Sequence, residues 1–219
     1  RHLSLIALLA CSDYEFHENT ETPPGDCGGF EAPQAGEAWI DAECISEPAV
    51  GSFSPTIEWQ WEENPLTPGY DMVMMTPVVA NLSDDNGDGL IDDADIPEII
   101  FTSYTGSSYS STGPINAISG DGSGMLWSIT SAGGHTWGGS GGVAVGDLEG
   151  DGRPDVCVAG STAAVVCIDG VDGTFKWAAG TETHLYGCPA IADMDGDGLA
   201  EVIFGRQVFS FEGEVLAHG

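Results

Sequence analysis

The feature that most constrains the fold of this sequence is a unit that occurs three times. Each copy consists of an apolar segment, an acidic Gly-Asp-Gly loop and a second apolar segment. The copies are "TPVVANLSDDNGDGLIDDADIPEIIF", "GGVAVGDLEGDGRPDVCVAG" and "CPAIADMDGDGLAEVIFG". Their Gly-Asp-Gly cores begin at Gly87, Gly150 and Gly196, so the spacings are 63 and 46 residues. The second spacing is typical of folds in which each repeat forms one small sheet.

The segments between the loops predict further strands and no helix. "GPINAISGDGSGMLWSI" and "AAVVCIDGVDGTFKWAA" each indicate a strand, a Gly/Asp turn and a strand, without an apolar spacing of three and four residues. We therefore predict an all-β fold, a β-propeller of four-stranded blades with about three to four blades in this chain. A parallel β-helix is the structural alternative. The longer first spacing predicts an inserted loop at "TSYTGSSYSSTG", and Trp127 and Trp177, at the same offset in their units, are expected to pack between blades.

Composition divides the chain into three parts. Residues 1–10 are interpreted as the end of an export signal, residues 11–54 as an acidic, Pro- and Gly-rich linker or small cap, and residues 55–219 as a partial propeller. The propeller is expected to begin with a strand in "TIEWQW", because Ile57, Trp59 and Trp61 alternate with polar residues. The missing initiator Met and the ending "LAHG" lead us to expect a fragment of a longer protein.

The charge balance limits the partners that this chain can bind. Asp and Glu number 35 against four Lys and Arg, which gives a net charge of −31. Binding to nucleic acid or to an anionic membrane surface is therefore disfavoured. Cations, cationic surfaces and neutral ligands such as sugars are the favoured partners, and we expect a monomer.

The N-terminal residues "RHLSLIALLACSDYEF" combine a basic start, an apolar run and an acidic stretch. "LLAC" resembles the lipobox of bacterial lipoproteins, which makes Cys11 a candidate for lipidation and for a membrane anchor. The alternative is an ordinary signal peptide with an incidental Cys. Either interpretation predicts an exported protein, secreted or held at the bacterial cell surface or outer membrane as a lipoprotein.

Export makes the remaining cysteines candidates for disulfides. Cys157 and Cys167 lie in apolar runs separated by a short turn, so a bond between neighbouring strands is plausible. Cys27 and Cys44 are a second candidate pair, and Cys188 is left over. Buried free thiols are the alternative for Cys157 and Cys167.

The acidic loops present side-chain oxygens at positions 1, 3, 5 and 9. The first loop offers Asp84, Asn86, Asp88 and Asp92, the second Asp147, Glu149, Asp151 and Asp155, and the third Asp193, Asp195, Asp197 and Glu201. Position 7, which is Leu90, Arg153 or Leu199, would add a backbone carbonyl. Several oxygen donors without Cys or His predict Ca²⁺. In the first loop Asp92, Asp95 and Glu98 compete as the closing ligand, because extra residues are inserted there.

These loops have two alternative interpretations, a solvated turn and an EF-hand. A single Asp-Gly-Asp-Gly loop can be a solvated turn, but three copies with carboxylates at set offsets favour a cation. An EF-hand needs flanking helices and a bidentate Glu at position 12. Position 12 is Asp95, Val158 or Phe204, and the flanks of the loops predict strands.

The repeats resemble the FG-GAP (VCBS-type) repeats of integrin-α-like β-propellers, over roughly residues 70–219. The resemblance is carried by "VAVGDLEGDGRPDVCVAG" and "AIADMDGDGLAEVIFG". It implies a calcium loop between the first two strands of each blade, with the ligands of the second and third loops named above, and a complete propeller of about seven blades. The first loop departs from the pattern. A fainter similarity to the tryptophan-docking repeats of quinoprotein dehydrogenases lacks their Thr-Gly pair.

These features predict a calcium-binding, extracellular binding or adhesion module for protein or glycan partners. No catalytic constellation stands out, since His135 and His184 lie in loops without an evident base or nucleophile. We therefore expect no enzymatic activity in this chain. The alternative is the propeller scaffold of a secreted enzyme, either a quinoprotein-like oxidoreductase or an enzyme acting on polysaccharides.

Overall fold

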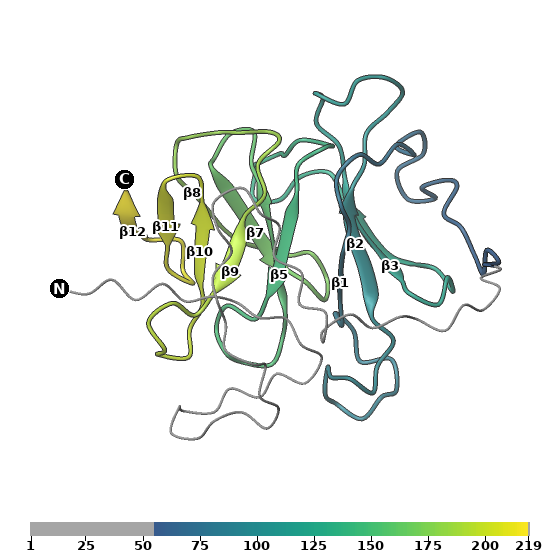
Figure 1. Ribbon diagram of the computed structural model, residues 1–219, viewed down its shortest axis with the longest axis horizontal. Helices are drawn as coiled ribbons and strands as arrows, with labels where there is room; N and C mark the ends of the chain where they lie inside the picture. The colour runs from purple at the N-terminus through teal and green to yellow at the C-terminus, as the bar shows by residue number, and fades with distance from the viewer. Residues whose placement is uncertain (1–54, 219) are drawn as a thin grey trace, which may run out of the picture. The chain divides into compact units, whose positions relative to one another are not determined.

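The computed structural model describes residues 55–218, which contain twelve strands and no helix (Figure 1). The strands are β1 (Val78–Ala80), β2 (Glu98–Thr102), β3 (Ile115–Ser119), β4 (Met125–Ile129), β5 (Val143–Gly146), β6 (Asp155–Ala159), β7 (Val165–Asp169), β8 (Phe175–Ala179), β9 (Ala190–Ala192), β10 (Glu201–Phe204), β11 (Gln207–Phe209) and β12 (Val215–His218). Within this range no helix has the length and apolar character needed to cross a bilayer. The export signal, Cys11, Cys27 and Cys44 lie outside the described residues.

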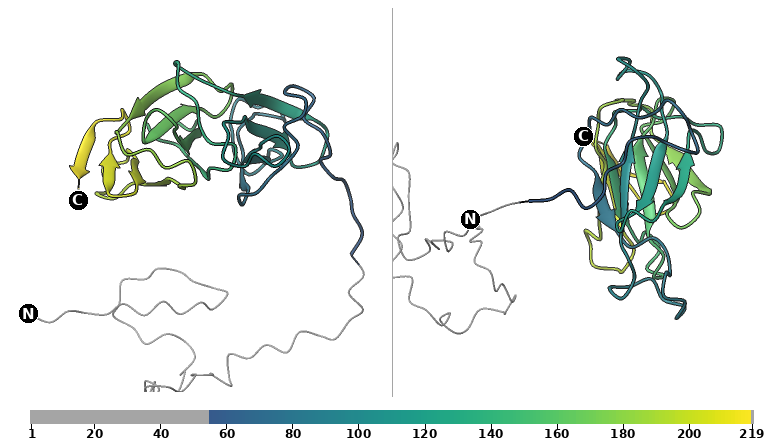
Figure 2. Two further views of the ribbon diagram at one scale, coloured as in Figure 1. Left: turned by 90° about the horizontal axis from the view of Figure 1, so that it is seen from above. Right: turned by 90° about the vertical axis from the view of Figure 1, so that its right-hand side faces the viewer.

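The strands form three antiparallel sheets of four consecutive strands each, β1–β4, β5–β8 and β9–β12. Each sheet runs back and forth in chain order, since every strand pairs antiparallel with the next strand of its sheet along the chain. The first strands of successive sheets contact each other, β1 with β5 and β5 with β9. The sheets therefore follow one another as the blades of a propeller do (Figure 2), and the prediction of an all-β fold with four-stranded blades is confirmed.

The middle sheet is buried on both faces. In β6, Val156 and Val158 pack into a core shared with the first sheet, while Cys157 and Ala159 pack into a core shared with the third sheet. All five residues of this strand are buried, which explains why the run "DVCVA" is apolar without polar alternation. The outermost strand β12 is exposed along its whole length.

Tryptophans of the fourth strands join each sheet to the next. Trp127 of β4 donates from Nε1 to the carbonyl oxygen of Gly170, 2.9 Å away in the turn after β7. Trp177 of β8 donates to the carbonyl oxygen of Phe211, 2.6 Å away in the turn after β11. Because each indole crosses from one sheet to the following one, the prediction that these residues pack between blades is confirmed.

The connections of the first sheet are longer than those of the second. The β2–β3 connection has 12 residues (103–114), whereas the equivalent β6–β7 connection has five (160–164). The loop between β1 and β2 is also longer, with 17 residues (81–97) against eight (147–154) between β5 and β6. The first repeat is thus extended at two places, and the sequence indicated both, as an inserted loop at "TSYTGSSYSSTG" and as extra residues in the first acidic loop.

The predicted strand over residues 57–62 is wrong for the described chain. These residues have no strand assignment, and Ile57, expected on the buried side, is 78% exposed. Trp59 and Trp61 are partly buried, so the alternation holds only for the two tryptophans. A strand requires a neighbour for its backbone hydrogen bonds, and none of the described strands pairs with this segment.

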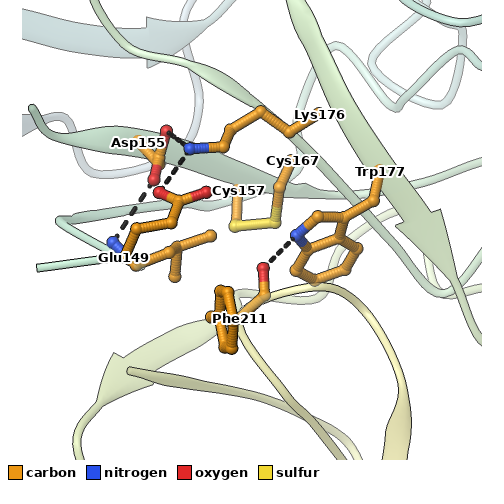
Figure 3. The surroundings of a disulfide bond; sticks show 8 residues. Glu149, Asp155, Cys157, Cys167, Lys176, Trp177 and Phe211 are labelled. Carbon is orange, nitrogen blue, oxygen red and sulfur yellow. Dashed lines mark hydrogen bonds and ion pairs between the residues drawn. A yellow bond between two sulfur atoms is a disulfide. The ribbon is translucent and has the colours of Figure 1, made fainter. Parts of the chain in front are cut away.

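Cys157 and Cys167 are joined by a disulfide inside the middle sheet (Figure 3). The two residues lie directly opposite each other in β6 and β7, with their Cα atoms 4.1 Å apart. Both are fully buried in the core shared with the third sheet. Cys188, in the connection before β9, is free and exposed.

We expect loss of this disulfide to destabilise the protein. The double substitution Cys157→Ala/Cys167→Ala should lower the free energy of unfolding by roughly 2–3 kcal/mol, because the bond restricts the unfolded chain over a short loop. Urea unfolding followed by tryptophan fluorescence measures this change. Cys188→Ser, which removes an exposed free thiol, is the matched control, and equal stability of the two variants would contradict the assignment.

Candidate metal centre

The three acidic loops leave their sheets at the same place. In each sheet the last residue of the first strand pairs with the first residue of the second strand. These pairs are Ala80 with Glu98, Gly146 with Asp155, and Ala192 with Glu201. Successive sheets therefore present the three loops at the same end.

The second and third loops each gather three carboxylates. The groups are Asp147, Glu149 and Asp151 in the second loop and Asp193, Asp195 and Asp197 in the third. In each group one carboxylate oxygen per residue lies within 4.8 Å of the others. These are positions 1, 3 and 5 of the predicted pattern, so the spacing alone brings the side chains together.

Backbone hydrogen bonds to the first carboxylate shape each loop. Asp147 accepts from the N–H of Gly150 at 2.8 Å and from that of Gly152 at 2.7 Å. Both glycines have positive φ angles, 70° and 83°, which a residue with a Cβ adopts only with strain. The third loop repeats the same bonds around Asp193. The glycines turn the chain so that alternate side chains converge.

The closing carboxylates at position 9 occupy a different place. Asp155 is the buried first residue of β6, and its Oδ2 accepts from the N–H of Leu148 at 3.3 Å. Glu201 begins β10 and accepts in the same way from the N–H of Met194 at 2.8 Å. Within the described residues, neither belongs to a cluster of three acidic side chains. In this structure they tie the loop to the sheet.

The backbone carbonyl expected from position 7 stays a prediction. The Arg153 side chain extends to Asp169 at the end of β7, with 3.1 Å between Nη2 and Oδ2. In the third loop the N–H of Leu199 donates to Asp197 Oδ1 at 2.8 Å. The position-7 residues therefore help to hold the turn through backbone N–H or side chain.

The first loop contains a similar turn, displaced outward from its sheet. Asp84 accepts from the N–H groups of Gly87 and Gly89 at 2.7 and 2.9 Å, as Asp147 does in the second loop. The residue that begins the second strand is Glu98, whose carboxylate accepts from the N–H of Leu82 at 2.6 Å. By its place at the start of the second strand, Glu98 is the equivalent of Asp155. By its offset from the first carboxylate, Asp84, the equivalent residue is Asp92.

The extra residues of the first loop bring Asp95 back across the turn. Its carboxylate accepts from the N–H groups of Asp92 at 2.9 Å and Asp85 at 3.0 Å. Backbone hydrogen bonds, with that from Asp92 the largest contribution, lower the pKa of Asp95. Asp92 accepts from the N–H of Ala94 at 2.8 Å. The loop 81–97 holds none of the three-carboxylate clusters found among residues 55–218.

Lys176, which the sequence analysis did not identify as a site residue, lies beside the carboxylates of Glu149 and Asp155 (Figure 3). Lys176 of β8 places its Nζ 2.8 Å from Asp155 Oδ1 and also contacts Glu149. Burial raises the pKa of Asp155 to about 7, with Lys176 opposing this shift and Glu149 adding to it. Two carboxylates share one ammonium group, so the second loop keeps an excess of negative charge. The sequence offered one hint to this residue: Lys176 is one of only four Lys and Arg residues in a strongly acidic chain.

We expect Lys176→Met to destabilise the metal-free protein. The substitution leaves the buried Asp155 beside Glu149 without a cation, which should cost about 2–4 kcal/mol of unfolding free energy at neutral pH. Urea unfolding in EDTA measures the loss. Arg206→Met is the matched control, because its ion pair with Glu182 is exposed and should contribute less than about 1 kcal/mol. Equal losses in the two variants would show that Lys176 is not a structural counter-ion.

Comparison with known proteins identifies the repeat. Residues 147–204 match the model of the FG-GAP-like repeat family. This segment contains the second and third loops and ends with β10. The comparison with curated protein sequences finds no match.

Three solved structures show distant likeness. The V. cholerae biofilm matrix protein Bap1 is 21% identical with a TM-score of 0.38, over 74% of this chain and 33% of that protein. The exotype rhamnogalacturonan lyase YesX is 15% identical with a TM-score of 0.31, over 65% of this chain and 40% of the lyase. The rhamnogalacturonan lyase YesW is 16% identical with a TM-score of 0.31, over 65% and 41%. The chain thus spans between a third and two fifths of these proteins.

The matched segment is offset from the sheets. It begins at Asp147, the first carboxylate of the second loop, and ends at Phe204, the last residue of β10, so it covers β6 to β10 together with the second and third acidic loops. The chain therefore contains an FG-GAP-like repeat at residues 147–204.

Proposed function

We propose that this chain is a calcium-stabilised, extracellular β-propeller module that binds protein or glycan partners. The observation that carries the proposal is the convergence of three carboxylates in each of two successive loops, with one oxygen of each within 4.8 Å of the others. Such groups repel one another in a compact fold unless a cation lies among them.

The donor set fits calcium. The ligands offered are carboxylate oxygens, supplied by Asp147, Glu149 and Asp151 in one loop and by Asp193, Asp195 and Asp197 in the other. Hard oxygen donors suit Ca²⁺ and Mg²⁺, and an all-protein cage on a turn suits Ca²⁺ better because Mg²⁺ retains its water. A bound ion would neutralise the carboxylates and fasten the turn between two strands.

The disulfide supports an extracellular location. Bonds such as Cys157–Cys167 form and persist mainly in oxidising compartments outside the cytosol. Extracellular calcium modules have dissociation constants of about 0.1–1 mM, which suits the calcium concentration outside cells. Both properties favour an exported protein, as the N-terminal sequence predicts.

An exposed tyrosine pair supports a binding role. Tyr109 lies in the β2–β3 connection and Tyr186 in the β8–β9 connection, and their ring centroids are 6.2 Å apart. Both side chains are 50% exposed. Because antiparallel strands alternate in direction, these connections leave the sheets at the end opposite to the acidic loops. Tyrosines at a surface present an apolar ring and a hydroxyl, which suits contact with glycans and proteins.

Calcium should raise the thermal stability of the protein. With a dissociation constant of ~0.1 mM, each site contributes about 1.4 kcal/mol at 1 mM Ca²⁺. Two sites should then raise the melting midpoint by about 5–10 °C relative to EDTA, and Mg²⁺ should have a much smaller effect. Differential scanning calorimetry measures these midpoints across a calcium titration.

Two loop variants separate the metal sites from ordinary turns. Asp151→Ala and Asp197→Ala should each reduce the calcium-induced rise by about half. Asp172→Ala is the matched control, since Asp172 also stabilises a turn by accepting from the N–H of Thr174 but belongs to neither cluster. A calcium response that is absent in the folded wild-type protein would reject the calcium sites.

Partner binding is tested with the tyrosine pair. A glycan array and immobilised polysaccharides, probed in 1 mM Ca²⁺, should retain the protein without releasing product. Tyr109→Ala should weaken retention at least about tenfold, as loss of a central aromatic contact does. Phe175→Ala is the control, because Phe175 is also an exposed aromatic residue but lies at the start of β8, away from the tyrosine pair. Product release from a polysaccharide would instead support the enzyme-scaffold alternative.

A further inference from the structure

The fourth strands of the three sheets share a bulge, and the residue at the bulge differs in charge between them. The pairing of β8 with β7 shifts register between Cys167 and Ile168, so Lys176 has no residue directly opposite it. The same shift occurs in the first and third sheets, where it leaves Leu126 in β4 and Leu216 in β12. The second sheet therefore carries a lysine at a position where the other two carry leucine.

The bulge places this lysine at the second acidic loop, since a bulge re-aims a side chain relative to its sheet. Lys176 Nζ lies 2.8 Å from Asp155 Oδ1 and also contacts Glu149 (Figure 3). The Lys176 side chain is only 22% exposed, and that of Asp155 is 1% exposed. The ammonium group is therefore a fixed part of the surroundings of this loop.

Lys176 contacts half of the side chains predicted as ligands of the second calcium site. Glu149 stands at position 3 and Asp155 at position 9 of the acidic pattern. Asp147 and Asp151, at positions 1 and 5, form no ion pair with Lys or Arg among residues 55–218. A calcium ion that binds all four side chains must share two of them with the ammonium group or displace it.

The third loop offers similar donors without an ammonium group. Its position 3 is Asp195, which is one methylene shorter than Glu149, and its position 9 is Glu201. Leu216, the equivalent of Lys176, carries no charge and is 56% exposed. In the part of the chain that the structure describes, no ion pair involves the carboxylates of this loop.

The second and third loops are neighbours, so the overall negative charge of the chain acts on both. A Cβ added to Gly150 in the second loop would lie 2.8 Å from the carbonyl oxygen of Gly198 in the third. The second loop also contains Arg153, but its guanidinium pairs with Asp169 outside the carboxylate cluster. The charge that distinguishes the ligands of the two sites is therefore that of Lys176.

We infer that Lys176 lowers the calcium affinity of the second loop, so that the third loop binds calcium first and the second fills at higher concentrations. The inference deepens the proposed function and rests on its two calcium sites. A divalent ion is repelled by the ammonium charge, which at about 6 Å in water weakens binding on the order of tenfold. Competition for Glu149 and Asp155 weakens it further.

The same lysine makes the second loop less dependent on calcium. Its charge offsets part of the repulsion between Glu149 and Asp155 when no ion is bound. The three clustered carboxylates of the third loop are all exposed and have no such counter-ion within residues 55–218. The chain therefore responds to calcium in two steps, with the third loop binding at the lower concentration.

Single-site variants of the full chain measure each loop separately. Asp197→Ala removes a clustered carboxylate of the third loop and leaves the second site, whereas Asp151→Ala leaves the third site. Isothermal titration with Ca²⁺ should give a dissociation constant at least about tenfold higher for Asp197→Ala than for Asp151→Ala. Two identical sites would contribute equally to the calcium-induced thermal rise, whereas Lys176 makes the loss larger in Asp197→Ala. Equal dissociation constants in the two variants would contradict the inference.

Removal of the lysine should strengthen the second site selectively. In the Asp197→Ala background, Lys176→Met should lower the dissociation constant about tenfold, while in the Asp151→Ala background it should have less than about a twofold effect. Arg206→Met in the Asp197→Ala background is the matched control, since it also removes one positive charge, at an exposed ion pair with Glu182. A second site that is unchanged by Lys176→Met would overturn the inference.

A reciprocal transfer keeps the test decisive if Lys176→Met does not fold. Asp195→Glu with Leu216→Lys places the same two side chains beside the third loop, at an exposed position of β12. In the Asp151→Ala background this pair should raise the dissociation constant at least about threefold, an effect reduced by solvent screening of the exposed lysine. Asp195→Glu with Leu216→Met is the control. Equal dissociation constants for the two pairs would count against the role of the lysine.

The titrations separate failure of the inference from failure of the proposed function. Calcium binding with equal dissociation constants in both loops, unaffected by Lys176→Met, would retain the calcium sites and reject the role of Lys176. Absence of calcium binding in every folded variant would reject both. Binding in the Asp197→Ala background that appears only after Lys176→Met would support the inference, because the ammonium group then excludes calcium from the second loop.

Discussion

The structure depends on the burial of the middle sheet between two neighbours. Because successive side chains of a strand point to opposite faces, Val156 and Val158 need one apolar partner surface while Cys157 and Ala159 need another. A sheet that is apolar on both faces cannot face water on either, so sheets must stack on both sides. This requirement places the three sheets next to one another and brings the three acidic loops to a common end.

The stacking has an electrostatic consequence. It concentrates negative charge at one end of the sheets, in a chain whose net charge is −31. The second and third loops balance this charge differently. Lys176 supplies an ammonium group to Glu149 and Asp155, whereas the group formed by Asp193, Asp195 and Asp197 is exposed. The two loops thus have the same spacing of carboxylates but different surroundings: an ammonium group lies beside the second loop, and the third loop faces solvent.

The sequence predicted the elements whose pattern is local. Short apolar runs bounded by Gly/Asp turns identified most strands, and the offsets of Asp147, Glu149 and Asp151 identified a cluster that the structure brings together. Lys176 could not be found in this way, because the turn between β7 and β8 carries it back to a loop 27 residues earlier in the chain. The sequence left Asp92, Asp95 and Glu98 open as the closing residue of the first loop for a related reason: the sheet register is set at Glu98, beyond the inserted residues.

The all-β class, the repeat and the acidic loops follow from the sequence alone, since short apolar runs and Gly-dependent turns act over a few residues. The tertiary structure alone decided which residues meet across sheets. The hydrogen bond from Trp59 to Gly120 spans 61 positions, and only the stacked sheets bring its two groups together. The alternation around Trp59 indicated a strand, but pairing requires a neighbouring backbone edge. That edge is a property of the assembled sheets, because backbone hydrogen bonds between strands do not depend on the local sequence pattern.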